Sequence, residues 1–287
     1  MVRARLEAFV NKTPGHVVIT GAAGAIGSAL ARAMRATWPD AELALVDRDE
    51  PVGVAAEVGG TAYRADLANL DALPALIERI EQNGRGWIDG LVNCAGVMHV
   101  RGVTAWRWED ARELVTIDLL APLRLQDLVV RGMVERGSGL LVNIASMAGR
   151  VPLKGCAYYG AAKAGLAMAS EIARADLKRS GVKVVTVYPG PVKSALEAGA
   201  RADYGGGGWF GGFAPTGDPG VLATKILRAI DEDRARVIYP SLYGVGWIAP
   251  NLSRRIALKF GPAPVDQPSD FESVTNRRSP AMPATLS

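Results

Sequence analysis

The chain has 287 residues, of which 49% are hydrophobic and 22% are charged, a composition that excludes a disordered or fibrous protein and allows a full hydrophobic core. Its formal net charge is +4 at pH 7, and because the basic residues are scattered along the chain they do not predict nucleic-acid binding. Two cysteines, Cys94 and Cys156, are too few for a disulfide framework and lack metal-ligand spacing, so we expect a cytoplasmic protein without a bound metal. With no leader pattern and no run of eighteen apolar residues, insertion into a membrane is not expected either.

The first predicted element is a β-branched run, residues 16–20, which ends at a glycine-rich turn and passes into an Ala- and Leu-rich stretch, 28–37. This order predicts strand, turn and helix. Glycines let the backbone approach a pyrophosphate, and the N–H groups of the following helix attract its negative charge. The candidate nucleotide contacts in the turn are Gly21, Gly24, Ala25, Ile26 and Gly27.

A second predicted strand, 42–46, ends at Asp47, about 20 residues after Gly27. At that separation an acidic side chain binds the adenosine ribose and repels a 2′-phosphate, which favours NAD as the cofactor. NADP stays open, because Arg48 would pair with a 2′-phosphate if Asp47 turned away. Asp47 could also simply open a turn.

Strand and helix go on alternating along the chain. Strands are predicted at 61–65, 88–93, 139–145 and 182–187, and helices at 69–82, at 106–136 with a kink at Pro122, and around Tyr159 as far as about Ser180. The pattern predicts a single Rossmann-like α/β domain, 14–260, with a doubly wound parallel sheet in an α/β/α sandwich. A polar arm, 1–13, and a disordered tail, 261–287, are expected to flank it.

The strand that begins at Ile88 ends in the small residues Asn93, Cys94, Ala95 and Gly96. Small residues are expected where backbone passes close beneath a bound cofactor. Asn93, Ala95 and Gly96 are therefore candidate cofactor contacts.

Tyr159 and Lys163 are four residues apart and would share one face of a helix. An ammonium group favours a phenolate beside it, so we expect Lys163 to lower the pKa of Tyr159 from near 10 toward neutrality, as general acid–base catalysis requires. By itself the spacing also fits a tyrosine at the edge of the core beside a solvated lysine.

Taken together, these motifs resemble the short-chain dehydrogenase/reductase family over about residues 17–240. The residues that carry the resemblance are Thr20 to Gly27, Asp66, Asn93 to Gly96, Ser146, Tyr159, Lys163, Pro189 and Gly190. The resemblance implies an oxidoreductase that transfers a hydride between a nicotinamide and a small alcohol or carbonyl substrate, and a homodimer or homotetramer. It also implies Asp66, Leu67, Pro189, Gly190 and Val192 as further cofactor contacts.

The same resemblance implies the catalytic roles. Tyr159 would be the acid–base residue, Ser146 would polarise the substrate oxygen, and Lys163 would lower the pKa of Tyr159 and hold the nicotinamide ribose. Hydride would pass directly between nicotinamide and substrate, so the protein would supply placement and electrostatics.

Three positions depart from the family pattern. Ala25 replaces the middle glycine of the turn, and Cys94 replaces a frequent second Asn. Asp118 lies where the family often has an Asn that anchors a water in the proton relay; an ionised Asp there would alter the pH optimum. Asp118 is therefore a candidate catalytic residue. The departures at Ala25 and Asp118 leave open a non-catalytic dinucleotide-binding protein with a regulatory or scaffold role.

Two C-terminal segments are expected to serve the substrate. The loop 191–218 holds glycines with Trp209, Phe210 and Phe213, which could form a lid over a hydrophobic substrate or a disordered loop with incidental aromatics. The segment 241–260 mixes apolar with basic residues and is expected to pack over the cleft or a neighbouring subunit, with a membrane surface as the alternative. His16 and His99 are expected to be structural.

Overall fold

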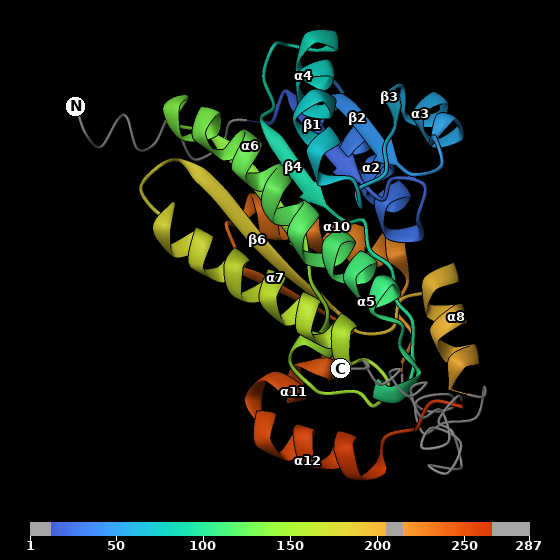
Figure 1. Ribbon diagram of the computed structural model, residues 1–287. Coiled ribbons are helices and arrows are strands. Elements are labelled where there is room, and N and C mark those ends of the chain that lie inside the picture. Colours follow the sequence, from blue (N-terminus) through green and yellow to red (C-terminus); the bar gives the residue numbers. More distant parts are fainter. Residues whose placement is uncertain (1–12, 205–214, 266–287) are drawn as a thin grey trace, which may run out of the picture.

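The computed structural model describes residues 13–204 and 215–265, which form a seven-stranded sheet with helices on both faces (Figure 1). Every strand pair is parallel, and the order across the sheet is β3-β2-β1-β4-β5-β6-β7. The predicted doubly wound α/β fold is confirmed. The strands are β1 (His16–Thr20), β2 (Glu42–Asp47), β3 (Thr61–Arg64), β4 (Gly90–Asn93), β5 (Gly139–Ile144), β6 (Val182–Pro189) and β7 (Arg236–Tyr239).

The helices alternate with these strands. They are α2 (Ala25–Thr37), α3 (Val52–Val58), α4 (Leu73–Asn83), α5 (Trp108–Val115), α6 (Ala121–Glu135), α7 (Ala157–Asp176), α8 (Ala195–Asp203), α10 (Pro219–Asp231), α11 (Val245–Ile248) and α12 (Pro250–Phe260). Short 3-10 turns lie at Leu70–Ala72, Val103–Ala105, Met147–Gly149 and Ser241–Gly244, and a π-helical turn, Thr116–Leu120, joins α5 to α6.

Two hydrophobic layers hold the helices to the sheet. Val17 and Ile19 of β1 point into the layer beneath α2 and α10, whereas Val18 points into the opposite layer beneath α4 and α6. Successive strand residues face opposite sides, and here both sides are buried, so the strand reads as a continuous apolar run. A continuous apolar run of this kind is the sequence pattern that predicts a strand buried on both faces.

The sheet has a topological switch point between β1 and β4. The chain adds β2 and β3 on one side of β1 and then crosses to place β4 on the other side. The loops that leave β1 and β4 therefore diverge, and the crevice between them is the usual ligand site of such a sheet. The same edge carries the ends of β5 and β6, where Ser146 and Pro189 lie.

The long helix predicted at 106–136 is in fact two helices with a π-helical turn between them. Pro122 has no N–H to give to the carbonyl of Asp118, four residues earlier, so regular α-helical bonding fails at that point and the helix widens. Asp118, in the widened turn, is fully buried. The helix that carries Tyr159 ends at Asp176, earlier than the predicted end near Ser180.

The predicted substrate loop, 191–218, is partly helical: its residues Ala195–Asp203 form α8. Helix α10 and strand β7 were not predicted either. Trp209, Phe210 and Phe213 lie outside the described residues, as do 1–12 and 266–287, so the lid, the arm and most of the tail stay predictions. The described chain continues past the expected boundary at 260, and the Val265 N–H donates a hydrogen bond to the Asp203 carbonyl (3.0 Å).

Candidate active site

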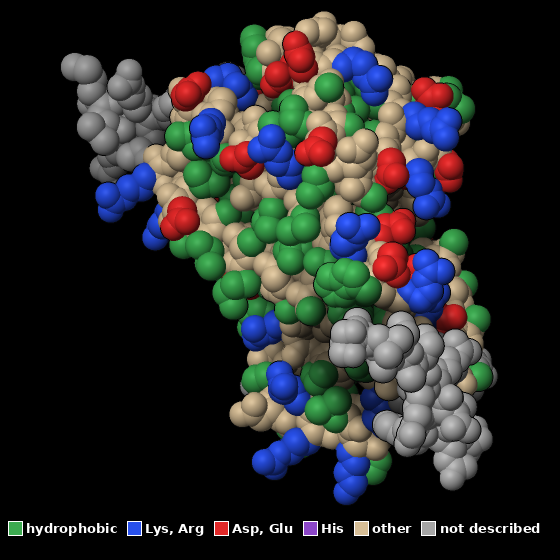
Figure 2. Space-filling view, viewed as in Figure 1, with side chains coloured by type: hydrophobic (Ala, Val, Ile, Leu, Met, Phe, Trp, Pro, Cys, Tyr) green, Lys and Arg blue, Asp and Glu red, His purple; other side chains and the backbone are tan. Residues whose placement is uncertain are grey.

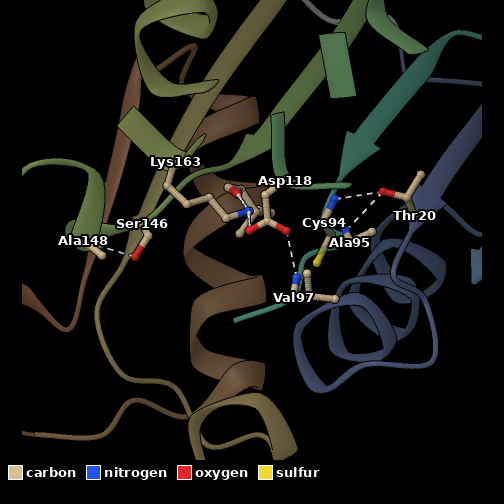
Figure 3. Close-up of polar contacts among 9 residues, drawn as sticks. Thr20, Cys94, Ala95, Val97, Asp118, Ser146, Ala148 and Lys163 are labelled. Atoms are coloured by element: carbon tan, nitrogen blue, oxygen red, sulfur yellow. Dashed lines mark hydrogen bonds and ion pairs between the residues drawn. The ribbon is translucent and has the colours of Figure 1, made fainter. Parts of the chain in front are cut away.

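The ends of β1 and β4 meet at Gly21. Its φ of +68° is in the left-handed region, and a Cβ there would lie 2.7 Å from the backbone of Ala95. The Thr20 hydroxyl fastens the two loops, accepting hydrogen bonds from the N–H groups of Cys94 (3.1 Å) and Ala95 (3.2 Å), as Figure 3 shows. Thr20 was not among the predicted site residues, although its place before Gly21 was the available signal.

The glycine turn leads to the open N-terminus of α2. Gly24 is the residue before the helix, and no side chain caps the first N–H groups. Such groups attract phosphate oxygens. Ala25 lines a separate shallow groove between α2 and the start of α10, whereas Ile26 lines the main cavity. Together with the close backbone approach at Gly21, this arrangement fits a dinucleotide pyrophosphate.

Asp47 faces the same turn from the end of β2. Its Oδ2 accepts a hydrogen bond from the Ala23 N–H (2.9 Å), and its Oδ1 accepts one from the Arg48 N–H (2.7 Å). The carboxylate is thereby held beside the glycine turn, and the side chain of Arg48 is exposed. Asp66, at the end of β3, is also exposed and accepts a hydrogen bond from the Ala68 N–H (2.9 Å), while Leu67 is buried in the core.

The side chain of Asn93 belongs to the core. Its Nδ2 donates to the Asn143 side chain (2.8 Å) and to the Pro122 carbonyl (3.3 Å). Asn143 in turn donates to the Ser170 hydroxyl (3.0 Å), which also receives a hydrogen bond from Thr186 (2.7 Å). This network ties β4, β5, β6 and α7 together, so only the backbone of Asn93 borders the crevice. No sequence motif indicated the network.

Ser146, Tyr159 and Lys163 come together at the end of β5. The Ser146 hydroxyl accepts a hydrogen bond from the Ala148 N–H (3.1 Å) and so shapes the turn that follows. That turn lies against α7, because a Cβ on Gly149 would be only 2.7 Å from the backbone nitrogen of Ala164. All three candidate side chains line one cavity of about 400 Å³, which Gly96, Pro189, Gly190 and Val192 also line.

Lys163 and Asp118 form a buried ion pair (Figure 3). The Lys163 Nζ lies 3.3 Å from Asp118 Oδ2, without the alignment of a hydrogen bond, and donates to the Ile144 carbonyl (3.2 Å). Asp118 Oδ1 accepts the Val97 N–H (2.8 Å). Burial raises the pKa of Asp118 against the lowering influence of Lys163. Although burial opposes the ammonium, Asp118 and Tyr159 hold the pKa of Lys163 above its ordinary value.

The expected low pKa of Tyr159 is wrong for this site. Burial raises the pKa of the phenol, and the lowering influences of Lys163 and of the Ser146 hydroxyl do not offset it. Asp118 adds to the rise, because its negative charge lies beside the cation that would stabilise the phenolate. The sequence places Tyr159 and Lys163 on one helix face but could not show that a carboxylate from another helix joins them.

The rest of the cavity is largely apolar and is closed by α8, α11 and α12. Side chains from the segment after β5, from α8, from the 3-10 turn before α11 and from α12 line it: Met147, Val151, Leu153, Leu196, Leu242 and Ile256. Ser253, Ile256 and Ala257 show that one face of α12 packs over the cleft, as predicted for the segment 241–260. At the side of α8, Arg201 and Glu197 form an ion pair.

His16 lies away from this chemistry, whereas His99 is near enough to Asp118 for its charge to act against the raised pKa of that carboxyl. His16 is buried with its Nδ1 3.0 Å from the Trp87 carbonyl oxygen, and His99 is exposed with its ring edge-on to Trp106. Cys156 is buried beside the Tyr204 hydroxyl (3.4 Å), and burial raises the pKa of its thiol to about 11. Within residues 13–204 and 215–265, no cluster of His, Cys, Asp and Glu is arranged to hold a metal ion, and none of the helices could span a bilayer.

The α/β sheet has an open glycine turn at its switch point, and a tyrosine and a lysine share one cavity beside that turn. These features are typical of a dinucleotide-binding fold with a redox site. The sequence profile of the short chain dehydrogenases matches residues 15–205. The chain belongs to the short-chain dehydrogenase family and is an oxidoreductase.

Three relatives illustrate the likeness. The ketoacyl reductase HetN of Nostoc sp. is 30% identical, over 85% of this chain and 88% of its own. The dehydrogenase/reductase SDR family member 7B of Danio rerio is 28% identical, over 83% of this chain and 81% of its own. A short-chain dehydrogenase from Sphingobium yanoikuyae, solved in complex with NADPH, is 27% identical with a TM-score of 0.70, and the match covers 89% of this chain and 98% of that one.

Proposed function

We propose that the protein reduces the carbonyl group of a fairly hydrophobic ketone, and oxidises the matching alcohol, with Tyr159 as general acid and base. The observation that carries this proposal is the meeting of Ser146, Tyr159 and Lys163 in one largely apolar cavity. The low exposure of these three side chains and the largely apolar lining limit the access of water and strengthen each hydrogen bond to the reacting oxygen.

Each side chain has a separate task in this mechanism. The nicotinamide ring, when bound, supplies or accepts the hydride. Tyr159 donates its hydroxyl proton to the carbonyl oxygen as the alcohol forms, and takes the proton back in oxidation. Ser146 donates a hydrogen bond to the same oxygen, and the ammonium group of Lys163 stabilises the phenolate that Tyr159 leaves behind.

The raised pKa of Tyr159 supports reduction as the favoured direction near neutral pH. A phenol that keeps its proton is ready to donate it, whereas oxidation needs the phenolate. The name of the Nostoc relative, a ketoacyl reductase, agrees with this direction.

We propose Asp118, the remaining catalytic candidate, as a positioning residue that acts through its contact with Lys163. The ion pair at 3.3 Å places a carboxylate where the family pattern has an amide. It lets the lysine keep its proton and at the same time weakens the lysine's effect on Tyr159.

For the cofactor we propose NAD. Asp47 supports this choice, because its carboxylate is held beside the glycine turn where it would meet a 2′-phosphate. NADP is the second candidate, favoured by the exposed Arg48 and by the NADPH bound to the Sphingobium relative. Gly21, Gly24, Ile26 and Gly27 would hold the pyrophosphate.

The remaining cofactor candidates follow the edge of the sheet. Asp66 and Leu67 would lie near the adenine, and the backbone from Asn93 to Gly96 would pass beneath the nucleotide. Pro189, Gly190 and Val192 would border the nicotinamide, because they line the cavity that holds Tyr159.

We further propose a cytoplasmic homodimer or homotetramer. Leu120, Met168 and Ile172 are exposed on the helical run that holds Asp118 and on the helix that holds Tyr159. Figure 2 shows hydrophobic side chains gathered over these helices on one face of the molecule. An apolar face of this kind is typical of a subunit contact, and light scattering of the purified protein would measure the assembly.

The test is a Tyr159→Phe variant beside Tyr158→Phe, which removes a hydroxyl from the neighbouring residue. We expect the first to lower kcat for ketone reduction at least about a hundredfold while the Kd of the dinucleotide hardly changes, and the second to stay within about threefold of the wild type. Full turnover by the Tyr159 variant would refute the assignment. Dinucleotide binding without turnover of any ketone or ketoacyl thioester would favour the non-catalytic alternative, against which the shared cavity of Ser146, Tyr159 and Lys163 speaks.

A further inference from the structure

Helix α12 has two different faces. Ser253, Ile256 and Ala257 line the cavity, and Leu252 (58% exposed) and Leu258 (49%) lie on the remaining surface of the helix. Phe260 (61% exposed) is the last residue of α12 and lies on the same side of the helix as Ser253. Leu242, in the 3-10 turn before α11, is 64% exposed as well. The helix lies along one end of the molecule, at the bottom of Figure 1, where its outer face is free of other described elements.

The outward face is also strongly basic. Arg254, Arg255 and Lys259 are exposed on it, and the chain has no Asp or Glu between Asp233 and Asp266. Residues 241–260, which include α11 and α12, form the lower lobe of the molecule, and Figure 2 shows Lys and Arg side chains along it. A short amphipathic helix with apolar side chains set among uncompensated cations is the pattern that binds the headgroup region of an anionic membrane.

The lobe is fixed firmly enough to act as a docking surface. The Trp247 ring of α11 lies beneath the guanidinium groups of Arg150 (3.9 Å) and Arg236 (4.7 Å) and contacts Tyr188 edge-on. Arg236 is held in turn by Glu171 (2.8 Å). These contacts tie α11 to β6 and β7, and α12 follows directly after α11 with Ser253, Ile256 and Ala257 against the cavity.

We propose that the outer face of α12 docks the protein on an anionic lipid surface, so that the cavity lined by the opposite face of this helix lies near the membrane. Charge complementarity decides the occupant: a second copy of the chain laid symmetrically on this face would set three cations against three cations. Entry of an apolar carbonyl substrate from the bilayer follows if the proposed function holds; the docking itself does not depend on it.

The test measures sedimentation with phosphatidylcholine vesicles, with and without about one third phosphatidylglycerol, in the absence of substrate. The full chain is expected to bind the anionic vesicles only, and to be released by salt. A triple variant, Arg254→Gln, Arg255→Gln and Lys259→Gln, is expected to bind roughly a hundredfold more weakly. Leu252→Ser with Leu258→Ser should also lose binding, because the apolar anchors of the outer face are removed.

The matched control is Arg131→Gln, Lys178→Gln and Arg179→Gln, which removes the same charge from exposed positions away from α12. Its binding should equal that of the wild type. Equal binding to neutral and anionic vesicles, or wild-type binding by the α12 triple variant, would overturn the proposal, as would a change of oligomeric state in that variant. Reduction of a water-soluble ketone, assayed without vesicles, tests the proposed function separately, and the α12 variants should keep it.

Discussion

Replacing Asp118 by Asn tests whether the buried carboxylate sets the pKa of the proposed acid–base residue. The substitution removes one negative charge with little change in volume, and an amide oxygen can still accept the Val97 N–H. Because Asp118 contributes to the raised pKa of Tyr159, its neutralisation should make the phenolate easier to form. The direction expected is therefore a lower pKa for Tyr159.

The magnitude follows from two distances. Lys163 Nζ lies 5.9 Å from the centre of the Tyr159 ring and 3.3 Å from the Asp118 carboxylate, so the carboxylate cannot be more than about 9 Å from the ring. At an effective dielectric constant of about 20, two charges at that separation interact by about 2 kcal/mol. An energy of this size changes a pKa by somewhat more than about one unit. The pKa of Tyr159 should fall by at least about one unit.

The assay is the pH dependence of kcat for alcohol oxidation, which rises as Tyr159 loses its proton. The rising limb should move to lower pH by about one unit in Asp118→Asn. Asp127→Asn, on the exposed side of α6, is the matched control and should leave the limb in place. An unmoved limb in the Asp118 variant would refute the reasoning, and a move to higher pH would show that Lys163 had lost its proton instead.

Asp118→Asn also leaves Lys163 buried without its counter-charge. Removing one partner of a buried pair typically costs about 3 kcal/mol or more, so the variant should unfold at lower urea concentration at pH 7. The kinetic comparison is therefore made at a temperature at which both variants are folded by circular dichroism.

Asp47→Ser should raise the ratio of NADPH affinity to NADH affinity about tenfold, because it removes the charge that would oppose a 2′-phosphate. Calorimetric titration with both dinucleotides measures this ratio, and an unchanged ratio would contradict the prediction. Gly149→Ala should lower kcat and cost about 1–3 kcal/mol, since its Cβ would press on the α7 backbone, whereas Gly199→Ala, where a Cβ meets nothing within 4 Å, should keep activity and stability. For Glu171, burial raises the pKa but the hydrogen bonds from Arg236 and Tyr188 outweigh it and hold the pKa below its ordinary value. The ionised carboxylate therefore stabilises the fold above about pH 4, and this stabilisation is lost as the pH falls through the native pKa. In urea melts, Glu171→Gln should lower the free energy of unfolding by at most about 1 kcal/mol at pH 7 and should not change it at acid pH.

The architecture and the order of the site residues along the chain could be predicted from local sequence patterns. Continuous apolar strands, an alternating helix pattern and a glycine turn are local signals, and they predict β1 to β6 and the glycine turn that follows β1, all of which the structure confirms. The spacing of Tyr159 and Lys163 likewise predicted that they share a helix face, since the pitch of a helix fixes which residues are neighbours.

The electrostatics and the enclosure of that site depend instead on contacts between segments that are distant in the sequence. The pKa of Tyr159 depends on burial and on Asp118, which reaches Lys163 from a different helix through a π-helical turn. The side chain of Asn93 turned into a core network whose partners lie on β5 and α7. Desolvation and charge coupling depend on distances between segments far apart in the chain, and residue spacing along the sequence does not contain those distances.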